Sequence, residues 1–427
     1  MKKLAYINLG CPKNQVDLEI ILGGMSSEVQ IVSDITHADI VLINTCAFIE
    51  PAKQESIDEI LNTAAFQQGG HKVFVSGCLP QRYQEELALE LPEVDRFFFS
   101  KDPYTTLKEL KAELSLNSTA NGRYPLSPSH YAFLRLSDGC NNRCSYCAIP
   151  LIKGELRSRT PEEIYENARQ LANQNVKELI LIAQDITSYG SDLDTDSTLS
   201  DVLQELNRIQ GIRWIRLLYT HPAHWSDRLI DVIADSEHIV PYVDMPIQHI
   251  SDEILKRMGR LVTRRDIENL IVKLRQRIPD LALRTSVITG FPGETEEQFN
   301  ELAEFIQNIQ FDRLGVFTYS HEEGTRAFQW PDSISESEKR NRQSELMQLQ
   351  SDISFEKNTR LVGKQLEVVA DNFLTPDIVS GRTVWDAPEI DNSVLLNNNA
   401  VPGSFYRIKI TSADVYDLQG EIVSHLS

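Results

Sequence analysis

Three closely spaced cysteines are the residues of this 427-residue chain most able to carry out chemistry. Cys140, Cys144 and Cys147 stand four and three residues apart in a loop rich in Gly and Asn. Zinc sites usually have four ligands supplied in pairs, and no fourth Cys or His lies nearby in the sequence. Three thiolates on a four-iron cluster would leave one iron open to another ligand. The spacing therefore favours an iron–sulfur cluster, with a zinc loop or unconnected core cysteines as the alternatives.

The other three cysteines are isolated in the sequence, but each directly follows a short apolar run. They are Cys11, Cys46 and Cys78. In a parallel sheet, the carboxyl ends of the strands meet at one edge, where ligands bind. The three thiols can therefore converge on a second three-thiolate site, although each cysteine alone is more often a small core residue.

The elements that must position these cysteines fall into three parts. Residues 1–116 alternate apolar runs with helical patterns, which predicts a doubly wound parallel sheet. Residues 117–130 are rich in turn formers and indicate a linker. Residues 131–358 continue the alternation with six strand–helix units, which predicts a complete or partial barrel with its chemistry at the carboxyl ends of the strands. Residues 360–427 predict a small all-β barrel of the oligonucleotide-binding type.

The predicted elements have definite bounds. In the first part, we expect strands at 4–9, 40–43, 73–75 and 97–99, and helices at 16–24, 52–67 and 83–91. In the second part, the expected strands are 132–136, 178–182, 214–218, 240–244, 283–288 and 313–319. In the last part, they are 365–370, 378–383, 393–396 and 406–413.

The charge of the chain limits its partners. Lys plus Arg is 42 and Asp plus Glu is 62, a formal charge of −20 that divides into −7, −9 and −4 over the three parts. Nucleic-acid phosphates attract Lys and Arg, so we expect a basic partner instead. No apolar run approaches the length of about 18 residues that a membrane span needs. The first residues resemble a strand and not a signal peptide, so we expect a cytoplasmic protein. In that reducing compartment, the cysteines are expected to be metal ligands or catalysts and not disulfides.

The first cysteine group, with Tyr146 just before its last cysteine, resembles the signature of radical S-adenosylmethionine enzymes. In that superfamily the open iron binds the amino and carboxylate groups of S-adenosylmethionine, whose cleavage gives a 5′-deoxyadenosyl radical. The resemblance implies that Tyr146 contacts the adenine. Gln184 and Asp185, which follow the predicted strand 178–182, either contact the amino group or form a polar pair in the loop. Gly290 either lets the adenine approach closely or makes a turn.

Further motifs resemble the methylthiotransferases within that superfamily, over essentially the whole chain. The N-terminal motifs are Asn8–Asn14, Ile43–Cys46 and Ser76–Cys78, and three later stretches agree: Met245–His249, Gly290–Thr295 and Phe317–Thr325. The C-terminal β domain matches the part called TRAM in that family. The resemblance implies two 4Fe–4S clusters, a radical one on Cys140, Cys144 and Cys147 and an auxiliary one on Cys11, Cys46 and Cys78.

The resemblance also implies the reaction. One S-adenosylmethionine methylates sulfur at the auxiliary cluster, and a second supplies the radical that abstracts hydrogen from the β-carbon of a target aspartate. The carbon radical then takes the methylthio group. A low-potential electron donor such as flavodoxin is expected. No residue beyond the cluster ligands is expected to be catalytic, since the cofactors carry the difficult chemistry.

Two branches of the family differ in substrate. One modifies adenosine in tRNA, and the other, the RimO branch, modifies an aspartate of small-subunit ribosomal protein S-12. The segments that resemble the RimO branch are Cys11–Asn14, Glu322–Thr325 and Gly381–Thr383 with Asp386–Asp391. The acidity of the chain independently favours a basic ribosomal protein over tRNA. A non-catalytic iron–sulfur carrier or RNA-binding adaptor is the alternative from another class.

Two other features are notable. Lys153 stands where similar sequences often carry Arg, so a bidentate contact is not expected there. His221 and His224 have no third ligand near them in the sequence, so we expect them in a loop or in the wall of the substrate cavity and not on a metal.

Overall fold

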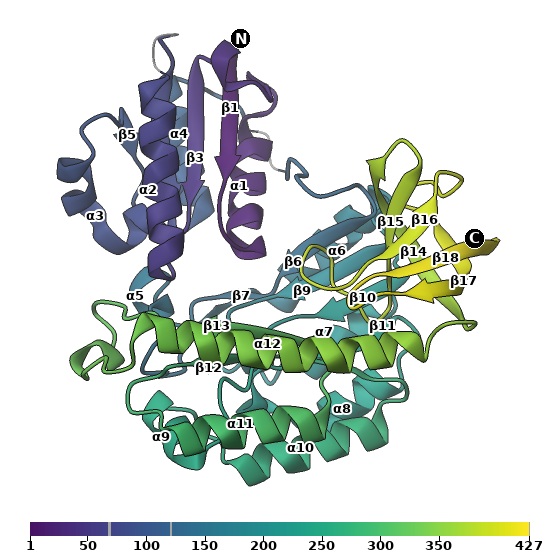
Figure 1. The fold of residues 1–427 in the computed structure, drawn as a ribbon. Coiled ribbons are helices and arrows are strands. Elements are labelled where there is room, and N and C mark those ends of the chain that lie inside the picture. The colour runs from purple at the N-terminus through teal and green to yellow at the C-terminus, as the bar shows by residue number, and fades with distance from the viewer. Residues whose placement is uncertain (67–69, 120–121, 427) are drawn as a thin grey trace.

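The computed structural model describes residues 1–66, 70–119 and 122–426 (Figure 1). Its first part is a parallel sheet of five strands in the order β2-β1-β3-β4-β5. The strands are β1 Lys2–Asn8, β2 Val29–Ile31, β3 Ile40–Thr45, β4 Lys72–Gly77 and β5 Arg96–Phe97. The helices are α1 Pro12–Met25, α2 Glu50–Ala65, α3 Cys78–Glu90 and α4 Pro103–Leu114.

The alternating side chains of the strands explain why helices cover both faces of this sheet. Leu4 and Leu42 face α1 and α4 in one apolar cluster. Ala5 and Val41 point to the other face, where Ile60 of α2 and α3 cover them. The predicted doubly wound parallel sheet is confirmed. The short edge strand β2 and helix α4 were not predicted, and the predicted end of the second helix at residue 67 lies outside the described residues.

The central part is a six-stranded parallel sheet in the order β13-β12-β11-β10-β9-β6, with β6 and β13 as its edges. The strands are β6 Tyr131–Arg135, β9 Glu178–Ile182, β10 Trp214–Leu217, β11 Ile239–Asp244, β12 Ala282–Thr289 and β13 Arg313–Thr318. All six lie within two residues of their predicted bounds. The sheet remains open, so the prediction of a partial six-unit barrel is confirmed.

Helices cover the outer face of this sheet, and one large apolar cluster fills the space between. They are α6 Pro161–Asn173, α7 Leu199–Leu206, α8 Asp227–Ala234, α9 Asp252–Met258, α10 Arg264–Arg277, α11 Glu296–Ile309 and α12 Glu336–Thr359. Short elements complete this part: β7 Ser137–Asp138, α5 Ile149–Ile152 and β8 Arg157–Ser158. Many of these helices begin with a capping residue. Thr160 at the start of α6, for example, forms a capping box with Glu163, which fixes where the helix begins.

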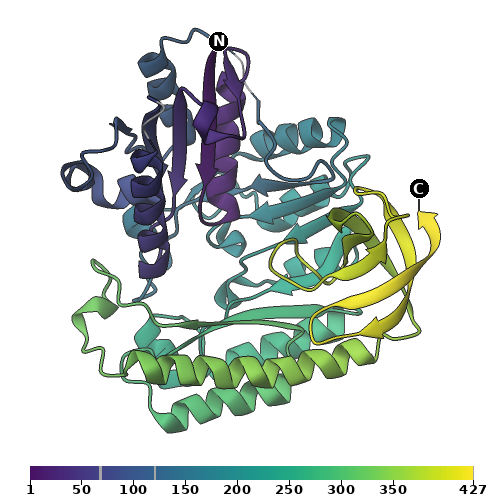
Figure 2. The ribbon, with the colours of Figure 1, turned by 45° about the horizontal axis from the view of Figure 1, so that its top comes forward.

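The C-terminal part is a closed five-stranded barrel in the order β14-β15-β16-β18-β17, shown in yellow beside the central sheet in Figure 2. Its strands are β14 Gln365–Thr375, β15 Ile378–Thr383, β16 Val394–Asn397, β17 Phe405–Ala413 and β18 Leu418–Leu426. The predicted all-β barrel is confirmed, with β18 as an additional strand. No helix in the described ranges is long and apolar enough to cross a membrane.

The segment between β15 and β16 attaches this barrel to the central sheet. Asp391 accepts hydrogen bonds from Tyr242 Oη at 2.6 Å and from Arg284 Nε at 3.3 Å. Asp386 pairs with Arg313 at the start of β13. Because the carboxylates of Asp386 and Asp391 are buried in these contacts, this segment joins two parts of the chain.

Candidate functional site

Strands β1, β3 and β4 end at the same level, and a cysteine follows each of them. In the strand register, Asn8 is paired with Asn44 and Asn44 with Ser76. Asn44 Nδ2 donates a hydrogen bond to Asn8 Oδ1 at 2.9 Å, and Ser76 Oγ donates one to Asn44 Oδ1 at 3.5 Å. The residues that follow this row within three positions are Cys11, Cys46 and Cys78. The sheet therefore brings all three cysteines to one edge, as the sequence predicted.

Two glycines allow the loops at this edge to pack closely. Gly10 has a φ of +92°, and a Cβ there would lie 2.8 Å from Cys46 Cβ. Gly77 has a φ of +93°, and a Cβ there would lie 2.5 Å from the carbonyl oxygen of Thr45. Only glycine combines this backbone conformation with so close an approach. The loops after β1 and β4 therefore both lie against the end of β3.

Asn14 connects the three loops through its side-chain amide. Its Nδ2 donates hydrogen bonds to the carbonyl oxygens of Leu9 at 3.1 Å and Thr45 at 2.8 Å. Its Oδ1 accepts a hydrogen bond from the thiol of Cys78 at 3.3 Å. The side chain is 1% exposed, so these contacts replace water for a fully buried amide. Asn14 is thus a positioning residue for the three thiols.

The chemistry of these thiols fits a positively charged metal group. Burial raises the pKa of Cys46, and it raises that of Cys78 to about 12 even though the nearby Lys153 ammonium acts in the opposite direction. The neighbouring Cys11 adds electrostatically to both effects. Buried thiols of this kind ionise when a metal coordinates them. Three soft donors from three loops match the open three-thiolate set of a four-iron cluster.

The group Cys140, Cys144 and Cys147 lies in the loop between β7 and α5, beyond the carboxyl end of β6. Gly139 starts this loop with a φ of +70°, and a Cβ there would lie 2.0 Å from the carbonyl oxygen of Glu155. The amide of Cys147 donates to the carbonyl of Cys144 at 3.3 Å, so the loop turns tightly between these two cysteines. Cys140 follows Gly139 directly.

These thiols are also shielded and fit the same kind of group. Burial raises the pKa of Cys140, and it raises that of Cys147 to about 12, with the charge of Cys144 contributing. Arg260 Nη1 lies 3.9 Å from Cys144 Sγ and is the cation beside this loop. The buried Nε of Arg260 has no hydrogen-bond partner within the described part of the chain, which leaves a donor for a bound ligand.

Tyr146 and Gly290 lie near each other but have different surroundings. The ring of Tyr146 is half-buried and meets the ring of Phe291 edge to face, with centroids 6.4 Å apart. Gly290 has a φ of +74°, and a Cβ there would lie 2.2 Å from Cγ of Lys339 on α12. A side chain at this position would clash with Lys339, so this packing contact is sufficient to require glycine. Adenine contacts for Tyr146 and Gly290 stay predictions.

Gln184 and Asp185 follow β9, as predicted, but only one of them is available for a ligand. Asp185 accepts hydrogen bonds from Asn142 at 2.7 Å, Ser188 at 2.6 Å and His224 at 2.8 Å, and from both the amide and the hydroxyl of Thr187. Burial raises its pKa, but these donors lower it far more, so the carboxylate stays ionised. Gln184 Oε1, in contrast, is buried without a partner among the described residues. A ligand amino group would fit Gln184 better than Asp185.

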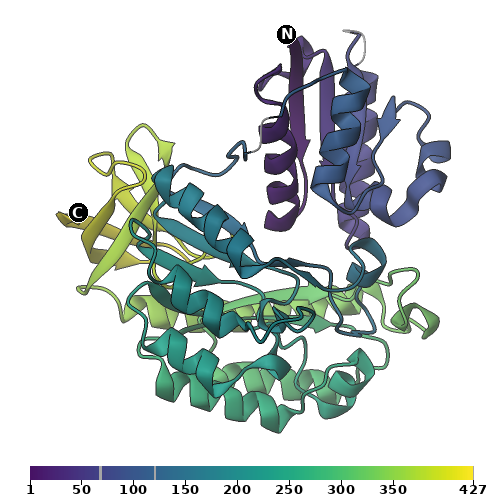
Figure 3. The same ribbon diagram turned by 180° about the vertical axis from the view of Figure 1, so that it is seen from behind.

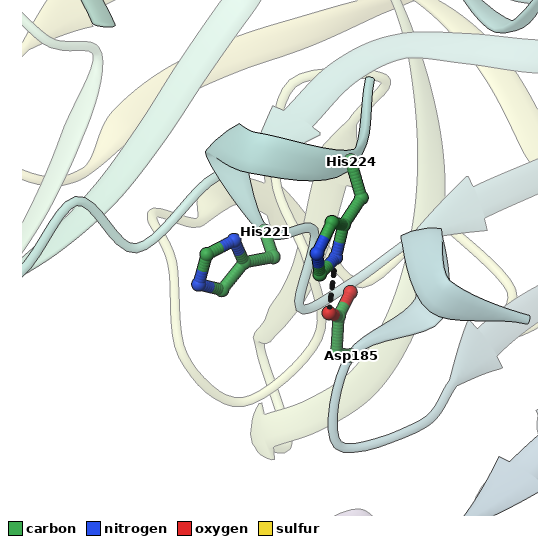
Figure 4. A group of neighbouring side chains, drawn as sticks. All are labelled: Asp185, His221 and His224. Carbon is green, nitrogen blue, oxygen red and sulfur yellow. Dashed lines mark hydrogen bonds and ion pairs between the residues drawn. The ribbon is translucent and has the colours of Figure 1, made fainter. Parts of the chain in front are cut away.

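The two histidines have a carboxylate beside them that the sequence order did not reveal. Candidate ligand atoms of Asp185, His221 and His224 all lie within 4.8 Å of one another (Figure 4). The expectation that no third ligand is near was therefore wrong, because the chain turn after β10 returns to Asp185 after β9. Asp185 already accepts several hydrogen bonds, and His221 Nδ1 accepts from the amide of Ala223 at 3.2 Å. These contacts describe a hydrogen-bonded support for the loop and not a metal centre.

Buried contacts hold the two cysteine regions against each other. Helix α1 packs on β6, where Asp17 of α1 pairs with Arg135 and, at 2.9 Å, with Lys153. From the first turn of α1, Lys13 Nζ reaches the carbonyl oxygen of Ala183 at 3.4 Å, directly before Gln184. Figure 3 shows the N-terminal sheet standing over the central sheet in this arrangement. The sheet edge that carries Cys11, Cys46 and Cys78 therefore faces the carboxyl ends of the barrel strands.

A second buried contact joins the far side of the two parts. Glu322, whose side chain is 2% exposed, accepts a hydrogen bond from Arg82 Nη1 at 2.8 Å and lies 3.3 Å from Lys53 Nζ. It also accepts from the amide of Glu50 at 2.7 Å and from Ser320. We call these residues the Glu322 ion cluster. It connects α2 and α3 to the loop after β13.

Family models match each part of the chain. Residues 134–306 match the radical SAM superfamily, residues 3–99 match the uncharacterized protein family UPF0004, and residues 362–423 match the TRAM domain. These matches agree with the central sheet, the N-terminal sheet and the C-terminal barrel respectively.

Curated relatives match the chain from end to end. The ribosomal protein uS12 methylthiotransferase RimO of Geobacter sulfurreducens is 45% identical, with 99% of each chain covered. The proteins of the same name from Pelobacter propionicus and Clostridioides difficile are 46% and 42% identical, with coverage of 98% or more. The chain belongs to the RimO family of methylthiotransferases.

Solved structures add the fold. A radical S-adenosylmethionine methyltransferase, TsrM from Kitasatospora setae, superposes with a TM-score of 0.56 at 13% identity, covering 74% of this chain and 73% of that one. The cobalamin-dependent enzyme OxsB gives 0.52 at 13% identity, covering 77% of this chain and 54% of that one. At such low identity these likenesses show the fold alone.

The sequence predicted the six cysteines as site residues, and this stays a prediction, while several supporting residues were not predicted. Asn14 lies inside a motif that carries the resemblance, but the sequence did not predict that its side chain would connect the three loops. The pairing of Asp17 with Lys153 joins residues far apart in the sequence, and no local pattern indicates it. The available signal is a charged residue beside the apolar run of a helix, such as Asp17 in α1.

Proposed function

We propose that this chain attaches a methylthio group to the β-carbon of an aspartate in ribosomal protein uS12. The observation that supports this most is the position of the two three-cysteine groups, on two edges that face each other across the contact of α1 with the barrel. The names of the full-length relatives support the same reaction and substrate. Membership of the radical SAM superfamily supports an iron–sulfur cluster and S-adenosylmethionine as cofactors.

Beyond this, we propose two 4Fe–4S clusters and two molecules of S-adenosylmethionine per turnover. When bound, the radical cluster on Cys140, Cys144 and Cys147 supplies the electron that cleaves S-adenosylmethionine, and the auxiliary cluster on Cys11, Cys46 and Cys78 holds the sulfur. Each cysteine would contribute a thiolate to one of these sites. Cys46 and Cys78 are buried, and the other four cysteines are half-buried.

The chain's other residues orient the reactants. Gln184 has an unpartnered oxygen that would accept from the amino group of S-adenosylmethionine, and Tyr146 would contact its adenine. Asp185 keeps the radical loop in place through its hydrogen bond to Asn142. Asn14 fixes the three loops of the auxiliary site.

The partners follow from charge and chemistry. A net charge of −20 favours a basic substrate such as a ribosomal protein, free or in the ribosomal particle. A low-potential donor such as flavodoxin would supply electrons. We retain 1–116, 131–358 and 360–427 as the proposed domains and 117–130 as the linker, part of which lies outside the described residues. The tRNA-modifying reaction is not favoured, since the curated relatives carry the uS12 name.

The test is a direct comparison of substrates. Protein reconstituted anaerobically with iron and sulfide is incubated with S-adenosylmethionine, a reductant and either uS12 or tRNA. A mass gain of one methylthio group on an aspartate of uS12 is expected, with none on tRNA. The reverse result, or no 5′-deoxyadenosine with either substrate, would contradict the proposal.

A further inference from the structure

Lys13 is a buried ammonium without a carboxylate partner. Its side chain is 9% exposed, and no ion pair with it occurs within residues 1–66, 70–119 and 122–426. Its ammonium has three donors, and the hydrogen bond to Ala183 at 3.4 Å uses one of them weakly. A buried charge is normally paired, because an unpaired charge that is removed from water strongly destabilises the folded protein.

The surroundings of Lys13 hold it in place but do not neutralise it. Its Nζ lies 3.6 Å from the centroid of the Tyr219 ring, an arrangement that attracts a cation through the face of the ring. Tyr219 has a φ of +64°, which is costly for a bulky residue, and its amide donates to Asp244 at 2.9 Å. Asp244 itself pairs with Arg284 at 2.8 Å. Asp244 is therefore already paired with another cation, and the other acidic groups beside Lys13 are the Tyr219 hydroxyl and the Cys11 and Cys78 thiols.

Lys13 lies between the Cys11, Cys46 and Cys78 group and the central sheet that carries the other three cysteines. It stands two residues after Cys11 in the first turn of α1 and reaches the residue before Gln184 at the end of β9. Of the other cations, Lys153 pairs with Asp17, whereas Arg260 lies beside the Cys140–Cys147 loop, where it contacts Cys144 Sγ and donates at 2.6 Å to the carbonyl of Pro246.

We propose that Lys13 binds the side-chain carboxylate of the target aspartate. This inference rests on the proposed function. The β-carbon that reacts is bonded to that carboxylate, so the carboxylate must enter the space between the two cysteine groups along with it. Thiolate-ligated clusters and a carboxylate repel each other at short distance in a water-poor site, and a cation there offsets the repulsion. Lys13 thereby selects aspartate over its neutral amide analogue.

The test compares binding and cluster content in the full, anaerobically reconstituted chain. Dissociation constants are measured for uS12 and for uS12 with the target aspartate replaced by asparagine, against wild type, Lys13→Met and Lys13→Arg. Lys72→Met is the matched control, because Lys72 is exposed at the opposite end of β4 in the same part of the chain. Iron and sulfide are determined for every protein.

Wild type and Lys72→Met should bind the aspartate form about 10- to 100-fold more tightly than the asparagine form, the range expected for a hydrogen bond to a charged group. Lys13→Met should bind the two forms equally, with unchanged iron and sulfide, and Lys13→Arg should recover part of the preference. An unchanged preference in Lys13→Met would overturn the inference. So would a loss of iron in that variant, which would assign the ammonium to the auxiliary cluster. If wild type adds no methylthio group to uS12, the proposed function fails, whereas equal modification by wild type and Lys13→Met overturns the role of Lys13 alone.

Discussion

The two cysteine groups of this chain are built in opposite ways. Cys140, Cys144 and Cys147 occupy one loop, which turns tightly between Cys144 and Cys147. Cys11 and Cys78 lie 67 residues apart, and they reach the same edge as Cys46 only because three parallel strands end in register. The radical site is therefore a local structure, and the auxiliary site is a property of the folded sheet. Substitutions in the sheet should damage the second site without damaging the first.

The largest expected effect separates the reactions of the two groups. In Cys144→Ala the radical site loses a ligand, so formation of 5′-deoxyadenosine should fall to background and no uS12 should be modified. The product is measured by chromatography after reduction with dithionite. Formation at the wild-type rate would show that Cys144 does not ligate the radical cluster.

Cys46→Ala should impair the auxiliary site and leave the radical site intact. This variant should still cleave S-adenosylmethionine at a measurable rate, since Cys46 lies outside the radical loop, but it should insert no sulfur into uS12. Mass spectrometry of uS12 and assay of 5′-deoxyadenosine in the same sample give both values. An intact yield of methylthiolated product would remove Cys46 from the auxiliary site.

Asn14→Ala should give an intermediate effect confined to the auxiliary site. The carbonyl groups of Leu9 and Thr45 lose their donor, and the Cys78 thiol loses its acceptor. Unfolding of the N-terminal part should become about 1–3 kcal/mol easier per buried group left without a partner. Denaturant titration and iron content measure this, with the exposed Asn62→Ala as the control. Equal losses in both variants would contradict the role of Asn14.

Glu322→Gln should have the smallest effect, because it alters how the two sites face each other and not either site itself. The ratio of methylthiolated product to 5′-deoxyadenosine should fall several-fold while each cluster stays loaded. The exposed Glu304→Gln serves as the control, since Glu304 lies on the solvent side of α11. An unchanged ratio in Glu322→Gln would show that the Glu322 ion cluster does not couple the two sites.

The same residue gives a pH dependence. Burial raises the pKa of Glu322, but hydrogen bonds from Ser320 and Arg82 and the charge of Lys53 lower it to a net value below the ordinary one. The folded pKa is thus lower than the unfolded pKa. Its stabilising contribution is complete above the ordinary glutamate value of about 4.3 and is lost as the pH falls through the folded value. Wild type should therefore lose more stability than Glu322→Gln on acidification below about pH 4.3.

The contrast between local and fold-dependent sites also explains what the sequence could predict. Strands such as Glu178–Ile182 contain a continuous apolar run, here residues 179–182, so their bounds could be predicted. Cys11, Cys46 and Cys78 could be grouped because each follows such a run. The short strand Val29–Ile31 has too few residues to form a pattern. Partners such as Asp391 with Tyr242, 149 residues apart, depend on how one barrel docks on another sheet, which no local pattern records.

The central claim is that each group of three cysteines holds its own four-iron cluster. The most direct measurement is the iron and sulfide content of the anaerobically reconstituted chain beside a variant in which Cys11, Cys46 and Cys78 are all alanine. Wild type should hold about eight irons and the variant about four, the difference of one cubane cluster. Equal iron in the two proteins, or zinc in place of iron, would contradict the claim.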